Sequence, residues 1–270
     1  MSKFRNMVTL RGKNRKTSVI VIYFVLRVLV VVCIVFQLLR GEYENAFLCF
    51  LYLLLLMVPA IMQDKFKIEL PSLLEIIVYL FIFSGTILGG IFNFYGNFPY
   101  WDSLLHVISG FIGAGFGFAL VDLLNKNNDK IKLSPFYIAF VALCFSMTVG
   151  VLWEFFEFSA DRLLLTDAQK DYVITTVSSD NLNPANNDKP MVIRGIAKTV
   201  MYDKNGDQLA VVEGGYLDIG IIDTMKDLMI NFAGALAFST LGYIYIKNWD
   251  KYKFTRNFIP KKATKNDLSG

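Results

Sequence analysis

The sequence predicts an all-α integral membrane protein, a bundle of six transmembrane helices with a small β-hairpin in its longest outer loop. Two observations carry this prediction. Hydrophobic residues make up 54% of the 270 residues and charged residues only 19%, which is too apolar for an ordinary soluble domain. The apolar residues also form continuous blocks, each near the ~20 residues that a helix needs to cross a bilayer.

Six spans are expected, at residues 18–39, 46–62, 73–94, 104–124, 135–156 and 228–246. The first has an apolar stretch longer than a typical signal core, and no small-residue cleavage site follows it, so we expect it to remain as an anchor. The domain organisation that follows is a basic N-terminus (1–17), helices one to five (18–160), an outer loop (161–222), the sixth helix (223–247) and a basic tail (248–270).

Lysine and arginine set the expected orientation, because short cytoplasmic connections are enriched in both. They gather in the two termini and in the second-to-third and fourth-to-fifth connections. The residues are Lys3, Arg5, Arg11, Lys13, Arg15, Lys16, Lys65, Lys67, Lys126, Lys130, Lys132, Lys247, Lys251, Lys253, Arg256, Lys261, Lys262 and Lys265. Both termini are therefore predicted to be cytoplasmic. These flanks account for the net charge of +4, and no separate basic surface indicates a nucleic-acid partner.

The outer loop is expected to begin as a polar loop, through Ser178-Ser179-Asp180-Asn181 and 183–187, and to end in a hairpin. Two β-prone runs, 192–202 and 208–212, flank a turn that contains Asn205-Gly206, a strong hairpin signal. Asp203, Asn205 and Asp207 imitate the start of a calcium loop. Gly214 stands where that loop needs a bidentate Glu, so a plain turn is favoured.

The main candidate site is a group of ionisable residues at the outer ends of the fourth, fifth and sixth spans. Within each span the members are three or four residues apart and so share one helical face. Ionisable groups at membrane depth are costly unless they pair, face a polar cavity or hold an ion. The three sets are Asp102 with His106; Glu154, Glu157 and Asp161; and Asp223, Asp227 and Asn231.

The charge balance of this group calls for a cation. Six carboxylates face at most three positive charges, from Arg162, Lys226 and a protonated His106, and carboxylates at close range repel one another. Imidazole with carboxylates suits zinc, manganese or iron, whereas oxygen ligands alone suit magnesium or calcium. The predicted cofactor is a divalent metal, and its identity stays open.

Small residues below the acids predict that the same three helices approach closely, because small side chains let helices pack tightly in lipid. They are Gly110, Gly113 and Gly117 on the fourth span, Gly150 on the fifth, and Gly234, Ala235 and Ala237 on the sixth. Packing within one chain and dimerisation through these faces both remain open.

Three motifs occur in order along the chain: Trp101-Asp102-Ser103-Leu104-Leu105-His106; Trp153-Glu154-Phe155-Phe156-Glu157 with Asp161; and Asp223-Thr224-Met225-Lys226-Asp227 with Asn231 and Gly234. In these motifs, and in Gly215 to Gly220 ahead of the third, the chain resembles the YjdF-type bacterial inner-membrane proteins. It resembles VanZ-like proteins more distantly, in the scattered His, Glu, Asp and Asn-x-x-Gly pattern alone. The first resemblance implies a helical membrane protein and these motif positions, and no reaction. The second implies a link to glycopeptide tolerance at the cell envelope.

Three classes of function follow from the candidate site. As an enzyme, the protein would be a metal-dependent hydrolase or transferase that acts at the outer leaflet on a lipid headgroup or a lipid-linked envelope precursor. The metal ligands would be His106, Asp102, Glu154, Asp161 and Asp227, and the catalytic residues Glu157, Asp223 and Asn231, with Glu157 or Asp223 as general base and Asn231 orienting a ligand.

The second class is a structural or sensory envelope protein in which the same residues form a polar network that ties helix ends together. Asp102 and Asp223 then need no further role, since acids at helix N-termini favour the helix dipole. Glu154 and Glu157 lie near a helix C-terminus, where negative charge is unfavourable. The helix dipole therefore does not explain these two residues, and they are the pair most expected to have a function. The third class is an ion- or proton-coupled transporter, against which the apolar inner halves of the spans count. Membrane lipid is the expected partner in each class, and the oligomeric state is open.

Overall fold

The computed structural model describes residues 16–61, 68–126, 132–184, 189–247 and 257–262. Most of the basic residues on which the predicted orientation depends, including those of 1–15, 62–67, 127–131 and 248–256, lie outside these described residues. The chain divides into two units, unit 1 with Met1–Gly150 and Ile230–Gly270, and unit 2 with Val151–Met229. Helices α8 and α9 each contribute one part to each unit.

The predicted six-helix membrane fold is confirmed. Within the described residues, six helices are long and apolar enough to cross a membrane: Thr17–Leu39, Tyr43–Ile61, Ser72–Ile91, Trp101–Asn125, Pro135–Leu164 and Ile221–Lys247. Their regular elements are α2 (Thr17–Leu39), α3 (Tyr43–Leu55), α5 (Ser72–Phe83) continuing as the π-helix η1 (Ser84–Ile91), α7 (Trp101–Lys126), α8 (Pro135–Leu164) and α9 (Ile221–Lys247), with the short α6 (Phe94–Asn97) ahead of α7.

Two helices extend by more than three residues beyond their predicted apolar spans. Helix α8 continues eight residues past the predicted end at Phe156, to Leu164, and α9 begins at Ile221, seven residues before Leu228. The hydrophobic pattern stopped at the charged residues, whereas hydrogen bonding along the helix backbone does not depend on side-chain polarity. Asp223 and Asp227 consequently lie in the first two turns of α9.

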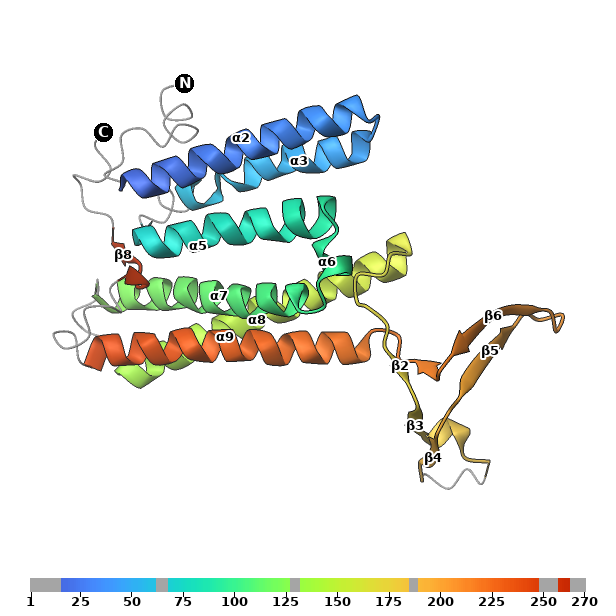
Figure 1. The fold of residues 1–270 in the computed structure, drawn as a ribbon. Helices are drawn as coiled ribbons and strands as arrows, with labels where there is room; N and C mark the ends of the chain where they lie inside the picture. Colours follow the sequence, from blue (N-terminus) through green and yellow to red (C-terminus); the bar gives the residue numbers. More distant parts are fainter. Residues whose placement is uncertain (1–15, 62–67, 127–131, 185–188, 248–256, 263–270) are drawn as a thin grey trace. The chain divides into compact units, whose positions relative to one another are not determined.

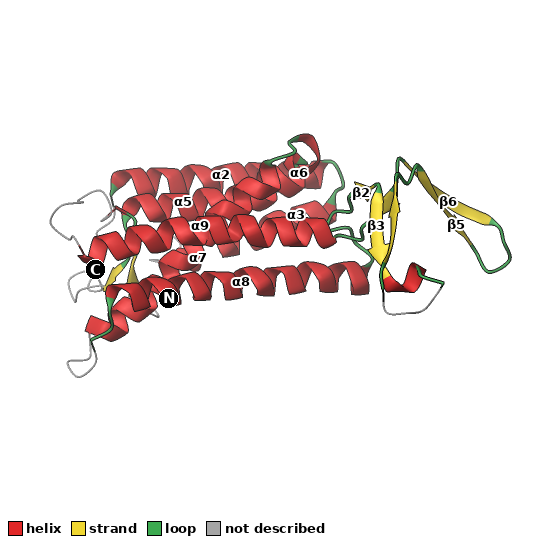
Figure 2. Ribbon diagram, turned by 90° about the horizontal axis from the view of Figure 1, so that it is seen from below, coloured by secondary structure: helices red, strands yellow, loops and turns green. Residues whose placement is uncertain are grey.

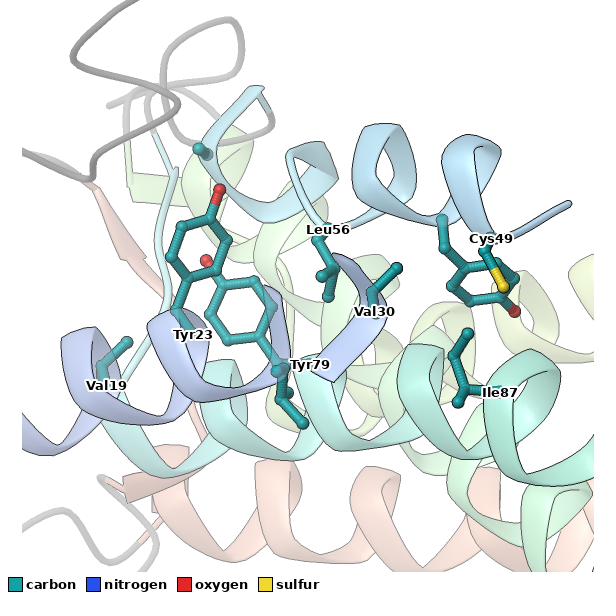
Figure 3. Packing of buried hydrophobic residues seen from close by; sticks show 10 residues of the cluster. Val19, Tyr23, Val30, Cys49, Leu56, Tyr79 and Ile87 are labelled. Carbon is teal, nitrogen blue, oxygen red and sulfur yellow. The ribbon is translucent and has the colours of Figure 1, made fainter. Parts of the chain in front are cut away.

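In unit 1, α2 packs against α3 and α5 (Figures 1 and 2). Figure 3 shows the buried side chains between them, among them Val30 of α2, Cys49 of α3 and Ile87 of η1. The rings of Tyr23 and Tyr79 lie 5.1 Å apart within this cluster. Van der Waals contact between these aliphatic and aromatic side chains holds the helices together, since lipid provides no hydrophobic drive for their association.

Helix α7 lies between two further cores of unit 1. On one side Leu74 and Val78 of α5 pack with Ile112 and Ala119 of α7. On the other side, the part of α7 around Phe118 packs with α8 and α9 through residues that include Ile138 and Phe238. Strand β1 (Ile68–Glu69) pairs antiparallel with β8 (Lys261–Lys262).

Unit 2 contains three two-stranded antiparallel pairs (Figure 2). Strand β2 (Val173–Ile174) pairs with β7 (Tyr216–Leu217), β3 (Thr176–Ser179) with β4 (Met191–Arg194), and β5 (Lys198–Tyr202) with β6 (Gln208–Glu213). The prediction of a polar loop at the start of this region was wrong at Ser178 and Ser179, because hydrogen bonds from β4 place both in a strand. The predicted β run 192–202 is interrupted at Gly195, whose φ of +67° is unfavourable for other residues.

The predicted hairpin is confirmed, and its turn uses the acid that suggested calcium. Asp203 Oδ1 accepts the backbone N–H groups of Asn205 and Asp207 at 2.9 and 2.8 Å, and Oδ2 accepts the Asn205 side-chain amide at 3.0 Å. Gly206 takes a φ of +89°. These hydrogen bonds hold the pKa of Asp203 below its ordinary value, the amide of Asp207 contributing most. The plain turn is the reading that this geometry supports.

Candidate functional site

Asp102 and His106 lie one turn apart at the start of α7, in unit 1. Asp102 Oδ1 is 3.7 Å from His106 Nε2, and His106 is buried. This separation allows an ion pair when the imidazole is protonated, and it also leaves both groups able to share a cation. The aromatic residues Phe94, Phe98 and Trp101 pack together directly ahead of the pair.

One turn further along α7, three helices meet at Asn231 of α9. The Asn231 side chain is buried, and its Oδ1 lies 3.2 Å from Ser109 Oγ of α7. Its Nδ2 lies 3.5 Å from the backbone oxygen of Ser146 and 3.6 Å from Met147 Sδ, both on α8. Asn231 therefore satisfies its amide through contacts with both neighbouring helices, as a buried polar group requires.

The predicted convergence through small residues is confirmed inside unit 1. A methyl group on Gly234 would overlap the Val107 carbonyl of α7, and one on Gly110 would overlap the Asn231 carbonyl of α9. A methyl group on Gly150 would lie 2.6 Å from Asn231 Nδ2, and one on Gly113 would lie 2.9 Å from Ser146 Oγ. These glycines pack α7, α8 and α9 within a single chain.

Three of the predicted acids, Glu154, Glu157 and Asp161, lie on the part of α8 that belongs to unit 2. Glu154 is buried, whereas Glu157 is half-buried. Glu157 Oε1 accepts a hydrogen bond from Trp153 Nε1 at 2.9 Å, and Trp153 itself is exposed. The two glutamates, predicted on one helical face, thus differ in surroundings, and only Glu154 is enclosed by protein.

Asp161 holds the segment that follows α8, residues 165–172, which we call the strap. Its Oδ1 accepts from Thr166 Oγ1 and the Ala168 backbone, and its Oδ2 accepts from the Gln169 backbone, at 2.6 to 2.9 Å. Both carboxylate oxygens are engaged by these bonds. The contacts favour a structural role for Asp161, and its role as a metal ligand stays a prediction.

The other end of the strap is held by the start of α9. Asp223 is buried and accepts from the Lys170 backbone at 3.0 Å. Asp218 accepts from the backbone of Tyr172 at 2.6 Å and of Ile222 at 2.8 Å, so it caps the first turn of α9. Sequence reasoning missed Asp218, because it stands three residues before Ile221, whereas the usual cap signal is an Asp immediately before the helix.

Strap residue Asp171 lies among other acids. Partial burial raises the pKa of its carboxyl above the ordinary value, and the negative charges of Asp167, Asp218 and Asp161 add to the effect. Apart from Asp161, the acids that crowd around Asp171 differ from those that the helical faces indicated.

The predicted residues therefore separate by their contacts. Asp161 and Asp223 bind backbone amides, Asn231 joins three helices, and Asp102 with His106 forms a pair. Ser109 and Ser146 were missed: Ser146 Oγ donates to the Gly110 carbonyl at 2.8 Å and is buried. Serines on an apolar helix carry no distinct signal, because they often bond to their own helix backbone.

Comparison with known proteins gives a family without an assigned activity. The family described as "Predicted membrane protein (DUF2238)" matches residues 21–248. A protein of Thermotoga maritima named "Uncharacterized protein" is 26% identical over 131 residues, which is 48% of this chain and 66% of that protein. The chain thus spans just under two thirds of the relative's length. No solved structure matches.

The match to the family model covers most of the chain, including all three motifs and the six spanning helices. The protein is a multi-pass membrane protein that belongs to the DUF2238 family of predicted membrane proteins.

Proposed function

We propose that this protein binds a divalent metal through Asp102, His106 and Asp227 and uses it at the outer leaflet on a lipid headgroup or a lipid-linked envelope precursor. The observation that carries the proposal is the distance of 3.7 Å between Asp102 Oδ1 and His106 Nε2, together with the burial of His106. A buried histidine with a carboxylate one turn away is a common start of a metal site.

Helix geometry supports Asp227 as the third ligand. Within unit 1, α7 and α9 run in the same direction: Gly110 meets Asn231, Gly115 meets Phe238, and Phe118 meets Gly242. Four residues earlier on each helix, about one turn, stand His106 and Asp227, on the same faces as Gly110 and Asn231. Asp227 is buried, and a buried carboxylate must be paired, hydrogen-bonded or bound to a metal.

Donor chemistry narrows the metal. One imidazole nitrogen with two carboxylate oxygens suits zinc, manganese or iron, and three protein ligands leave a position for water or substrate. A metal there would lower the pKa of bound water and polarise a phosphoryl or carbonyl oxygen.

Glu154 is the candidate for a further ligand or a base. It stands one turn after Gly150 on α8 and is buried, and Gly150 packs against Asn231. Glu157 and Asp223 remain the alternatives for general base, and Asn231 for positioning. Asp223 is the weaker of these bases, because it already accepts a backbone hydrogen bond.

A second function, a polar network that ties helix ends together in a structural or sensory envelope protein, is favoured by Asp161, Asp223 and Asn231. Each accepts or donates hydrogen bonds that explain its presence without chemistry.

A transporter is a third proposal, for which no contact in the described residues argues. The YjdF-type name, the inner membrane and cytoplasmic termini complete the proposal, and the VanZ-like resemblance stays a prediction.

The test is metal content, measured by elemental mass spectrometry on detergent-purified protein prepared without chelator or metal-affinity tag. We expect near-stoichiometric metal in the wild type and its loss in His106→Ala and Asp227→Asn. Asp122→Asn is the matched control, because Asp122 is a buried acid on the same helix, α7, five turns away. It should retain the metal.

A thermal melt of chelator-treated protein separates metal loss from misfolding. Adding zinc or manganese should raise the Tm of wild type and Asp122→Asn and leave that of the two site variants unchanged. Correctly folded wild type that neither contains nor takes up metal would refute the metal site and leave the polar network as the better function.

A further inference from the structure

A group of aliphatic side chains in unit 2 projects outward where α8 ends and α9 begins. Leu163, Leu164 and Leu165 are 80%, 73% and 88% exposed, and Ile219 and Ile221 are 63% and 58% exposed. We call these five residues the aliphatic collar. Scattered exposed hydrophobics are ordinary, but adjacent ones with this much exposure mark a surface with a partner.

Two members of the collar hold a backbone conformation that side chains of their type avoid. Leu165 has φ +55° and Ile219 has φ +59°, in the left-handed region that a β-branched residue such as isoleucine rarely enters. Glycine or asparagine would fit both positions at lower strain. Aliphatic side chains at these two positions are explained when they contact a binding partner, because that contact offsets the backbone strain.

Two acids next to the collar accept hydrogen bonds from protein. Asp161 accepts the amides of Ala168 and Gln169, and Asp218 accepts the amides of Tyr172 and Ile222. These bonds tie the strap to the ends of α8 and α9 within unit 2. The five collar side chains themselves are apolar and favour hydrocarbon, whereas the exposed Asp167 of the strap requires water or headgroups.

The collar is also continuous with surfaces that lipid covers. Leu163 and Leu164 end the spanning helix α8, whose preceding residues Phe155, Phe156 and Phe158 are exposed. Ile221 begins the spanning helix α9, which exposes Met225 and Met229. Arg162, the residue directly before the collar, lies with its guanidinium 5.5 Å from the Phe158 ring centre, a cation–π contact with the exposed aromatic surface of α8.

We propose that the aliphatic collar inserts into the bilayer as an interfacial anchor, so that the turns at Leu165 and Ile219 lie at the boundary between acyl chains and headgroups. The occupant of this surface is lipid, and not a second copy or a soluble partner. The strap is then held at the level of the headgroups.

Spin labels test this in vesicles of three parts zwitterionic to one part anionic phospholipid, on a background with Cys33→Ala, Cys49→Ala and Cys144→Ala. Labels at Leu165→Cys and Ile219→Cys should be accessible to oxygen and protected from a water-soluble nickel complex, as a label at Phe156→Cys should be. Leu209→Cys is the control, because Leu209 is similarly exposed, at 69%, but lies on hairpin strand β6 and not at the end of a spanning helix. It should be accessible to nickel.

Leu163→Cys repeats the measurement on ordinary helical backbone, in case a label at Leu165 alters its turn. Nickel accessibility at Leu165, Leu163 and Ile219 equal to that at Leu209 would overturn the anchor. Protection of these labels from both oxygen and nickel would also overturn it, because it would indicate a protein partner instead of lipid.

Discussion

Gly234→Ala tests how closely helices α7 and α9 pack against each other and how much this close packing contributes to stability. The added methyl group would overlap the Val107 carbonyl and lie 3.1 Å from the Phe111 amide nitrogen, so the helices must separate by about 1 Å to reach ordinary contact distance. Overpacking of this kind costs about 1 to 3 kcal/mol. The 3.2 Å contact between Ser109 and Asn231 would stretch beyond hydrogen-bonding range, which adds roughly 0.6 kcal/mol.

We therefore expect Gly234→Ala to lose about 1.6 to 3.6 kcal/mol, which corresponds to roughly 3 to 14 °C in Tm for a chain of this size. The assay is thermal unfolding in detergent, followed by the loss of soluble monodisperse protein. Gly90→Ala is the matched control, because its methyl group meets nothing within 4 Å. Equal Tm values for the two variants would refute the close crossing of α7 and α9.

Three further predictions concern unit 2. Asp161→Ala should release the strap and make it cleavable by limited proteolysis, at a cost of about 1 to 3 kcal/mol for the amides left unpaired, whereas Asp167→Ala, at an exposed strap position, should leave the cleavage pattern unchanged. The pKa of Asp203 is lowered in the folded hairpin, so its charge stabilises the turn above the ordinary pKa of about 3.9, and this stability is lost as pH falls through the lower folded pKa. The NMR chemical shifts of the hairpin amides should titrate in that pH window. In Asp203→Asn they should not titrate. The raised pKa of Asp171 has the opposite sign: its contribution is present below the ordinary pKa and lost as pH rises through the folded value, so Asp171→Asn should raise the Tm at pH 7 and have no effect near pH 3.

The spanning helices could be predicted from hydropathy because every span is an apolar block, and backbone groups in lipid must be satisfied within a helix. The same signal began the sixth span only at Leu228, and it was the spacing of Asp223 and Asp227 that put both acids on the sixth helix. Strands β2 and β3 could not be found, since two to four residues that include Ser178 and Ser179 carry too little pattern.

For the candidate site, spacing placed Asp102 and His106 together correctly, because both lie on one helix where periodicity fixes the separation. Spacing could not show that both carboxylate oxygens of Asp161 accept hydrogen bonds from strap amides, because the spacing of side chains does not indicate which backbone groups they bind. Nor could it separate Glu154 from Glu157. Two residues that share a face differ in burial only through what packs against that face.

The buried amide of Asn231 has a consequence for how the chain is assembled. Its partners, Ser109 of α7 and Ser146 and Met147 of α8, are synthesised long before it, and the whole of 161–222 lies between. The Ser146 hydroxyl bond to Gly110 lets α7 and α8 join first and wait in the membrane as a pair. The last helix then enters with an amide that hydrocarbon cannot satisfy. Docking beside this pair satisfies the amide, so a polar residue in the final span favours completion of the bundle.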